Sequence, residues 1–248
     1  MKTWNNWLIV VPARLKSSRL PEKMLADLCG KPLIIRVFER LRPLKERGAT
    51  ILVATDNEKI EQVCRSHSVP VKLTDKNHQS GTDRCAEVAK NYKKEYVMNV
   101  QGDEPFVNVE ELENLAHTME QNSSQMGTII YKNKNEKSFL SENTVKVVVN
   151  KAQEALYFSR APIPFKRNHD FDWFWQHQGI YAFQTNTLFK FCDLPMSELE
   201  KYEKLEQLRA IEHKINIKLV ESKHPSVGID TADDLKEARE YYERLSQN

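Results

Sequence analysis

Short apolar runs that alternate with segments of helical spacing constrain the fold of this chain more than any other feature of its sequence. The first run, at 7–13, is uninterrupted and rich in β-branched residues, which predicts a strand buried on both faces. Further strands are predicted at 49–55, 69–73 and 95–100, and helices at 32–44, 58–66 and 81–92, the last with Ser80 or Thr82 as its N-cap. This alternation predicts βαβ units and a parallel sheet.

The pattern changes after a further predicted helix at 109–121. Short strand-like runs joined by polar loops follow, at 127–131, 145–149, 155–158 and 178–183. They predict antiparallel strands added to the sheet, which is then mixed. A helix is predicted at 199–214, a strand at 215–220, and a closing helix at 231–245 that begins with a capping box of Thr231 and Asp234. Because no repeat or Gly- and Pro-rich linker interrupts the chain, we expect one compact domain with a substrate-binding lobe.

Charge and cysteine content exclude several classes of protein. The chain has 37 basic and 35 acidic side chains, a net charge of +2, which argues against a general nucleic-acid coat. The four cysteines are far apart and form no CxxC pair, so we interpret them as reduced thiols rather than disulfides or zinc ligands. The apolar run at 8–11 is too short for a signal peptide or a membrane span. We expect a cytoplasmic protein without membrane insertion.

Charged residues gather where the predicted parallel strands end, the edge at which such sheets bind ligands. The loop 14–23 follows the first strand and has four cations and two hydroxyls within ten residues. A triphosphate needs such cations and the N–H groups of a tight loop, although a solvated basic loop has the same composition. Neither GxxxxGK[ST] nor GxGxxG is present. Asp103 follows the fourth strand, where it either holds a divalent ion against phosphates or bonds its own backbone in a turn.

The remaining polar segments each allow a structural and a functional interpretation. Asp230 caps the closing helix, and a role as metal ligand requires that it meet Asp103 in space. The loop 75–83 suits contacts with a base or ribose, or is a plain connector. Arg160 follows an aromatic strand and is either a surface residue or a fork for a carboxylate. Donors and acceptors for a polyol, each equally compatible with a structural role, are His177, Tyr181, Glu206 and Gln207.

Taken together, these segments resemble the 3-deoxy-manno-octulosonate (KDO) cytidylyltransferases. The resemblance rests on VPARLKSSRLP at 11–21, GKPLI at 30–34, VATD at 53–56, HQSGTDR at 78–84, NVQGDEP at 99–105, VKVV at 145–148, ALYFSRAPIP at 155–164, HQGIYAF at 177–183, LEQLRAIE at 205–212 and GIDTADDL at 228–235. These motifs span nearly the whole chain in the family's order. CMP-sialate synthetases share the fold and parts of the first loop but not this full set.

The resemblance implies an α/β fold of three layers, with a mainly parallel mixed sheet of the Rossmann-like nucleotide-diphospho-sugar transferase type. It implies one cytidylyltransferase domain over 1–248, with a nucleotide-binding part at about 1–125, a sugar-binding and dimerisation part at about 126–220 and a C-terminal metal loop and helix at 221–248. The expected reaction is Mg²⁺-dependent transfer of CMP from CTP to the anomeric hydroxyl of KDO, giving CMP-KDO and pyrophosphate for lipopolysaccharide-type glycan synthesis. A homodimer is also implied.

The resemblance also implies a role for individual residues. The nucleotide would be bound by Arg14, Arg19, Lys23, Ser80, Gly81 and Gln101. The sugar acid would be bound by Gln101, Arg160, His177, Tyr181, Glu206 and Gln207. Arg14, Lys23 and Asp103 would be catalytic, and Asp103 and Asp230 would bind Mg²⁺. Three alternatives stay open: transfer to another acid such as 8-amino-KDO or sialic acid, use of another base, and a non-catalytic nucleotide-binding regulator.

One departure from the family lies in the loop 14–24, which the resemblance implies binds the triphosphate and which we call the phosphate loop. The family's loop usually reads PGKP, whereas this chain has Glu22 and Met24 on either side of Lys23. We expect an acid at position 22 to weaken triphosphate binding unless it points outward or meets Arg19. A smaller departure is AF at 182–183, where GY is common.

Overall fold

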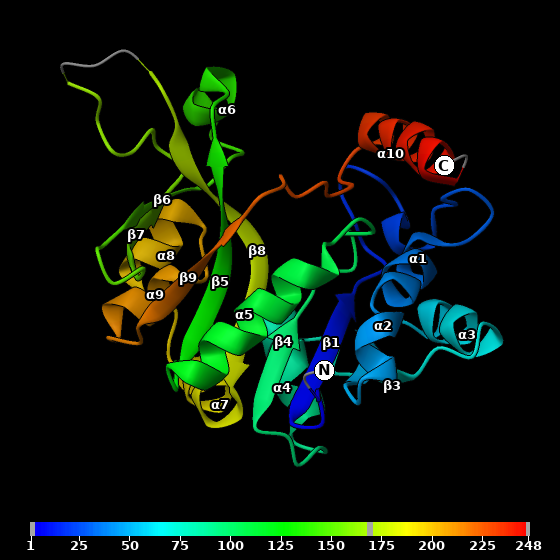
Figure 1. Ribbon diagram of the computed structural model, residues 1–248. Helices are drawn as coiled ribbons and strands as arrows, with labels where there is room; N and C mark the ends of the chain where they lie inside the picture. Colours follow the sequence, from blue (N-terminus) through cyan, green and yellow to red (C-terminus); the bar gives the residue numbers. More distant parts are fainter. Residues whose placement is uncertain (1–2, 168–170, 247–248) are drawn as a thin grey trace. The chain divides into compact units, whose positions relative to one another are not determined.

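The computed structural model describes residues 3–167 and 171–246, and it divides into two compact units (Figure 1). The first consists of Met1–Val109 and Ser226–Asn248, and the second of Glu110–Pro225. The chain therefore leaves the first unit once and returns to it for its last segment. That the whole chain acts as one domain stays a prediction.

A parallel sheet forms the centre of the first unit. Its strands lie in the order β3 (Val71–Leu73), β2 (Thr50–Thr55), β1 (Trp7–Ala13) and β4 (Tyr96–Asn99), and every pairing between them is parallel. All seven residues of β1 are buried, as expected for a strand covered on both faces. The predicted βαβ organisation of this part of the chain is confirmed.

The end of β1 explains how a proline fits a central strand. The ladder between β1 and β4 ends at Val10, whose carbonyl accepts a bond from Val100 N–H. Pro12 lies two residues further on and faces the same side, so its missing N–H removes no bond from this ladder. The hydrogen-bonded pairing of β1 with β4 therefore ends at the carboxyl edge of the sheet.

The helices of the first unit follow the predicted segments with one correction. They are α1 (Leu33–Arg40), α2 (Arg42–Glu46), α3 (Glu58–Ser66), α4 (Gly81–Ala89) and α10 (Ala232–Ser246), with a 3₁₀ turn η1 (Lys23–Leu25). The single helix expected at 32–44 is wrong, because the chain ends α1 and begins α2 with Pro43 in its first turn. Ser80, not Thr82, caps α4, and Thr231 and Asp234 form the predicted reciprocal pair.

A mixed sheet forms the second unit, as predicted. Its strand β5 (Met126–Asn133) pairs antiparallel with β8 (Phe174–Gln184) and parallel with β9 (Ile217–Ser222). The antiparallel pair β6 (Lys146–Val149) and β7 (Ala155–Ser159) joins through β6. The helices are α5 (Val109–Gln121), α6 (Glu136–Leu140), α7 (Thr185–Asp193), α8 (Glu198–Glu203) and α9 (Leu208–Glu212).

The helix predicted at 199–214 is also wrong, since α8 and α9 replace it. Lys204 adopts a left-handed conformation with φ of 53°, which ends α8, and the chain restarts at Leu208. Sequence patterns gave no indication of α6 or α7. Within residues 3–167 and 171–246, no helix has both the length and the apolar character needed to cross a membrane.

Candidate active site

Lys23 joins two carboxylates that are far apart in the sequence. Its side chain is 8% exposed, and Nζ lies 2.6 Å from Asp103 Oδ2 and 2.8 Å from Asp230 Oδ1. Burial alone lowers the pKa of Lys23, but the two carboxylates outweigh burial and hold this pKa above its usual value. The ammonium group therefore stays charged and binds both acids at once.

Asp103 and Asp230 lie close together in the structure, as a shared role in metal binding requires. Asp103 O accepts a bond of 2.9 Å from Ile229 N–H, which fixes the two segments side by side. Asp234 Oδ2 accepts bonds from the N–H groups of Asp230 and Thr231, so the start of the closing helix orients Asp230. Hard carboxylate oxygens that converge on one cation are the donor set that Mg²⁺ takes in proteins.

Arg19 and Glu22 take partners that the sequence did not predict. Arg19 Nη2 lies 3.0 Å from Asp230 Oδ2, so this arginine extends the cluster of Lys23, Asp103 and Asp230. Glu22 does not meet Arg19. Its carboxylate oxygens lie 2.7 and 2.6 Å from Nζ of Lys59, at the start of α3.

Gly102 allows the turn that presents Asp103 to lie against the phosphate loop. A Cβ at this position would stand 2.9 Å from Pro12 O and 2.9 Å from Met24 Sδ. No other side chain fits without movement of the backbone at the end of β1. Met24, the second departure from the family, is buried and fills the space beside this glycine.

Glu104 is a member of the cluster that sequence reasoning missed. Ser226 Oγ lies 2.5 and 2.6 Å from its two carboxylate oxygens. Burial raises the pKa of Glu104 to about 7, and the negative charges of Asp103 and Asp230 act in the same direction. The only sequence signal was its place directly after Asp103.

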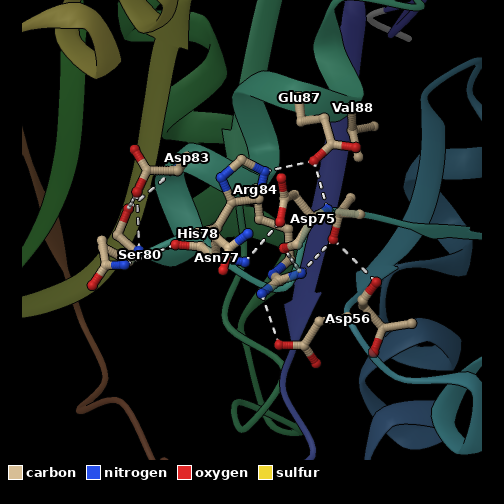
Figure 2. A network of polar contacts seen from close by, with 12 residues as sticks. Asp56, Asp75, Asn77, His78, Ser80, Asp83, Arg84, Glu87 and Val88 are labelled. Atoms are coloured by element: carbon tan, nitrogen blue, oxygen red, sulfur yellow. Dashed lines mark hydrogen bonds and ion pairs between the residues drawn. The ribbon is translucent and has the colours of Figure 1, made fainter.

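The loop that leads into α4 is held by a dense polar network (Figure 2). Glu87 Oε2 accepts bonds from Asp75 N–H and from His78 Nε2, at 2.9 and 2.5 Å. Burial alone raises the pKa of Glu87, but these two bonds hold it below its usual value. Ser80 and Asp83 bond each other's backbone N–H groups at 3.0 Å in a capping box. The predicted nucleotide residue Ser80 is thus part of a fixed helix start.

Arg84 lies at the centre of this network and was not assigned from the sequence. Its side chain is fully buried and binds Asp56 Oδ2 at 3.0 Å as well as the hydroxyl of Thr74 (Figure 2). Burial lowers the pKa of Arg84, and the Asp56 carboxylate opposes this effect. Arg84 therefore positions the loop from within rather than facing a ligand.

Arg14 has a buried donor that meets no acceptor among residues 3–167 and 171–246. Its Nη2 atom is buried and makes no hydrogen bond within the described part of the chain. Arg14 also contributes to the lowered pKa of Arg84, so two guanidinium groups lie near each other here. A buried cationic donor without an acceptor is costly unless a ligand supplies one.

Three predicted sugar-binding residues come together in the second unit. The ring of His177 contacts Phe158 and Tyr181, with centroids 5.1 and 5.3 Å apart, and its Nε2 lies 3.1 Å from Thr128 Oγ1. Burial lowers the pKa of His177 to about 3, so the imidazole is neutral. The pKa of Tyr181 is raised, first by burial and then by the charge of Glu206.

Gln207 also has a buried donor that lacks a hydrogen-bond partner among the described residues. Its side chain is buried, and Nε2 makes no hydrogen bond among the residues described. Together with the neutral imidazole of His177 and the hydroxyl of Tyr181, this amide suits the hydroxyl groups of a sugar. The other amide, Gln101, donates to Asn99 Oδ1 at 3.2 Å in the first unit.

Arg160 is engaged with backbone carbonyl groups. Its Nε and Nη1 donate to the carbonyls of Glu203 and Glu142, at 2.8 and 2.9 Å, and its own N–H donates to the Glu203 carboxylate at 2.9 Å. The buried ammonium of Lys146 donates to Arg160 O. A guanidinium has five donors, so this one keeps N–H groups for a further acceptor. Its predicted fork with a sugar carboxylate stays a prediction.

Comparison with known proteins shows the family to which the chain belongs. The family model described as "Cytidylyltransferase" matches residues 8–218. The 3-deoxy-manno-octulosonate cytidylyltransferase of Francisella tularensis subsp. holarctica is 41% identical over 245 residues, which cover 94% of this chain and 97% of that protein. The protein of the same name from Geobacter sulfurreducens is 39% identical over 247 residues, with 95% and 98% covered.

Solved structures show the same relationship. The structure of CMP:2-keto-3-deoxy-manno-octonic acid synthetase complexed with CTP is 37% identical, with a TM-score of 0.91 over 96% of this chain and 99% of that one. A cytidylyltransferase from Leptospira borgpetersenii, 15% identical with a TM-score of 0.61, shares the fold. The predicted fold class, a mixed α/β sheet with helices, is confirmed. The chain belongs to the 3-deoxy-manno-octulosonate cytidylyltransferases, a family of nucleotidyltransferase enzymes.

Proposed function

We propose that this enzyme transfers CMP from CTP to the anomeric hydroxyl of KDO, giving CMP-KDO and pyrophosphate for lipopolysaccharide-type glycan synthesis. The observation that carries the proposal is the cluster in which Lys23 binds Asp103 and Asp230 while Arg19 binds Asp230. It combines cations for a triphosphate with carboxylates for a divalent ion at the carboxyl edge of a parallel sheet.

The triphosphate would be held by Arg14, Arg19 and Lys23. The buried Nη2 of Arg14 supports this role, because it has no acceptor among the described residues and a phosphate oxygen would supply one. These three cations would also stabilise the negative charge that develops on the departing pyrophosphate. Ser80 and Gly81 would border the base, at the capped start of α4.

Asp103 and Asp230 would hold Mg²⁺ as two protein carboxylates, with substrate phosphates and water as further ligands. Their oxygens already converge on one cation, the ammonium of Lys23, which supports the fit. Mg²⁺ is commonly bound in this way in nucleotide enzymes. When bound, the ion supplies charge neutralisation at the phosphate oxygens.

The sugar acid would be bound by Gln101, Arg160, His177, Tyr181, Glu206 and Gln207. The neutral imidazole and the buried amide of Gln207 support contacts with hydroxyl groups, and Arg160 would bind the carboxylate. The oxygen of the anomeric hydroxyl would attack the α-phosphorus in line as its proton passes to solvent, the bond to the bridging oxygen would break, and pyrophosphate would leave with the electron pair of that bond. The protein contributes orientation and charge stabilisation.

The test is pyrophosphate release with CTP, Mg²⁺ and a panel of sugar acids. We expect turnover with KDO and much less with 8-amino-KDO or N-acetylneuraminate. Higher kcat/KM with either of these would assign the chain to a different acid. Replacement of CTP by ATP, GTP or UTP tests the base. Absence of pyrophosphate with every pair would favour the non-catalytic regulator.

A homodimer and a cytoplasmic location belong to the same proposal. Exposed apolar side chains in the second unit support a subunit interface; they are Leu140, Leu156, Phe165, Met196 and Tyr202. Light scattering coupled to gel filtration would give twice the monomer mass for a dimer. All four cysteines are free thiols, as expected in a reducing compartment.

A further inference from the structure

Glu22 adopts a backbone conformation that favours glycine. Its φ and ψ are 51° and 31°, in the left-handed region, where a side chain with a Cβ is disfavoured. Its carbonyl accepts a bond of 2.8 Å from Leu25 N–H and so begins the turn η1. Lys23 is the next residue. The conformation of Glu22 therefore determines the direction in which Lys23 leaves the loop.

The side chain of Glu22 is attached to a different element. Lys59 Nζ contacts both carboxylate oxygens, and the two side chains are about half exposed, at 49% and 55%. Lys59 lies in the first turn of α3, where its N–H is capped by Asn57 Oδ1 at 2.8 Å. The buried residues Ile60 and Cys64 anchor α3 in the first unit. Because α3 is anchored, the ion pair with Lys59 restrains the position of Glu22 in the loop.

We propose that Glu22 and Lys59 are a positioning pair, which ties the phosphate loop to α3 and so holds Lys23 between Asp103 and Asp230. The inference rests on the proposed function, since it assumes that Lys23 handles the triphosphate. Lys59 neutralises Glu22 locally, so the acid does not compete with the phosphates for Arg19 and Lys23. Without the pair, the loop would be less ordered before CTP binds, and the freedom lost on binding would weaken the affinity for CTP.

The pair has little effect on folding. Exposed ion pairs contribute little to stability, and the left-handed conformation disfavours glutamate relative to glycine. The ion pair between Glu22 and Lys59 therefore acts mainly by limiting the conformations of the phosphate loop. Its effect should be visible in CTP binding and in the mobility of the loop, with little change in melting temperature.

Two double variants separate positioning from charge. Glu22→Gln with Lys59→Gln removes the pair and keeps the net charge, whereas Glu22→Lys with Lys59→Glu keeps both pair and net charge. We expect the first to raise the KM for CTP about two- to fivefold, the size of one exposed ion pair, with the KM for the sugar acid unchanged. The second should behave like the wild type.

A control pair of the same residue types lies in the second unit. Glu198 and Lys201 are 2.7 Å apart and similarly exposed, and Glu198→Gln with Lys201→Gln should leave the KM for CTP unchanged. The positioning pair is refuted if both double variants at positions 22 and 59 match the wild type, or if both raise the KM equally.

Hydrogen exchange tests the same inference without turnover. In the ligand-free protein, the double glutamine variant should exchange the amide of Leu25 faster than the wild type, because its bond to Glu22 O opens more often. The charge-reversed variant should retain wild-type exchange. Equal exchange in all three proteins would overturn the pair even if the proposed reaction is confirmed. A failed reaction with faster exchange would overturn only the proposed function.

Discussion

Lys23 connects the chemistry of this protein to its fold, because its ammonium contacts both Asp103 and Asp230. Each of these three residues comes from a different segment: the phosphate loop, the turn after β4 and the start of α10. Each of the two carboxylates offsets part of the free-energy cost of burying the Lys23 ammonium. A substitution at any one of these three residues should therefore alter the contacts of the other two.

Replacement of Asp103 by asparagine preserves shape and removes one charge. We expect kcat to fall on the order of a hundredfold or more, because both a proposed metal ligand and a partner of Lys23 are lost. Mg²⁺ affinity, measured by calorimetry in the presence of CTP, should fall with it. Asp233→Asn, an exposed acid on α10, is the control. Wild-type turnover at limiting Mg²⁺ would remove Asp103 from the site.

Replacement of Arg160 by lysine tests the assignment of the sugar carboxylate. Lysine keeps the charge but loses the planar fork, so the KM for the sugar acid should rise about tenfold while the KM for CTP stays constant. Arg65→Lys, at an exposed arginine bound to Glu61, should change neither. A change in the KM for CTP instead would show that Arg160 acts on the nucleotide.

Among helices and strands, sequence patterns predicted the bounds of those elements whose ends are set by neighbouring residues in the chain. The bounds of β1, α3 and α5 agree with the predicted ranges, because each is a single apolar pattern between polar ends. The predicted helices at 32–44 and 199–214 failed where one backbone feature interrupts a continuous pattern, Pro43 in one and the left-handed Lys204 in the other.

Sequence patterns predicted individual candidate site residues but not how they are arranged in space. Segments that end strands of a parallel sheet were expected to meet, yet nothing local indicated that Asp230 returns to Asp103. Arg84 gave no signal, because an arginine in a short helix is normally exposed. The partner of Glu22 was likewise hidden, since Lys59 follows 37 residues later on an amphipathic helix.

Gly102 gives the sharpest prediction for a single element. Alanine at this position would bring a Cβ to 2.9 Å from the backbone oxygen of Pro12, so the turn and the end of β1 must separate. We expect a loss of stability of about 1–3 kcal/mol and a raised KM for CTP. Gly179→Ala is the control for stability, because a Cβ at that position would meet no heavy atom within 4 Å. Equal melting temperatures for the two variants would contradict the close packing at Gly102.

At the scale of the whole molecule, stability should depend on pH through His177. Its pKa is about 3 in the folded protein and 6.5 in the unfolded chain, so the folded imidazole stays neutral where the unfolded one takes up a proton. Its contribution to stability is therefore complete above pH 6.5 and is lost as the pH falls toward 3. Between about pH 7 and about pH 5 the expected loss is about 1–2 kcal/mol.

Urea unfolding of the wild type and His177→Gln at both pH values measures this contribution. The variant should lose less stability on acidification than the wild type does. His213→Gln, at an exposed histidine of the same unit, should retain the wild-type dependence. A variant at position 177 with an unchanged pH dependence would show that this imidazole titrates normally in the folded protein.

We propose that the cluster of Lys23, Asp103 and Asp230 serves the transfer of CMP to a sugar acid. Phosphorus NMR of the enzyme with CTP, Mg²⁺ and KDO follows every phosphorus atom of that reaction. We expect the three CTP signals to decay while CMP-KDO, seen as one phosphodiester signal, and pyrophosphate form in equal molar amounts. Release of inorganic phosphate, formation of free CMP without the phosphodiester, or unchanged CTP would contradict it.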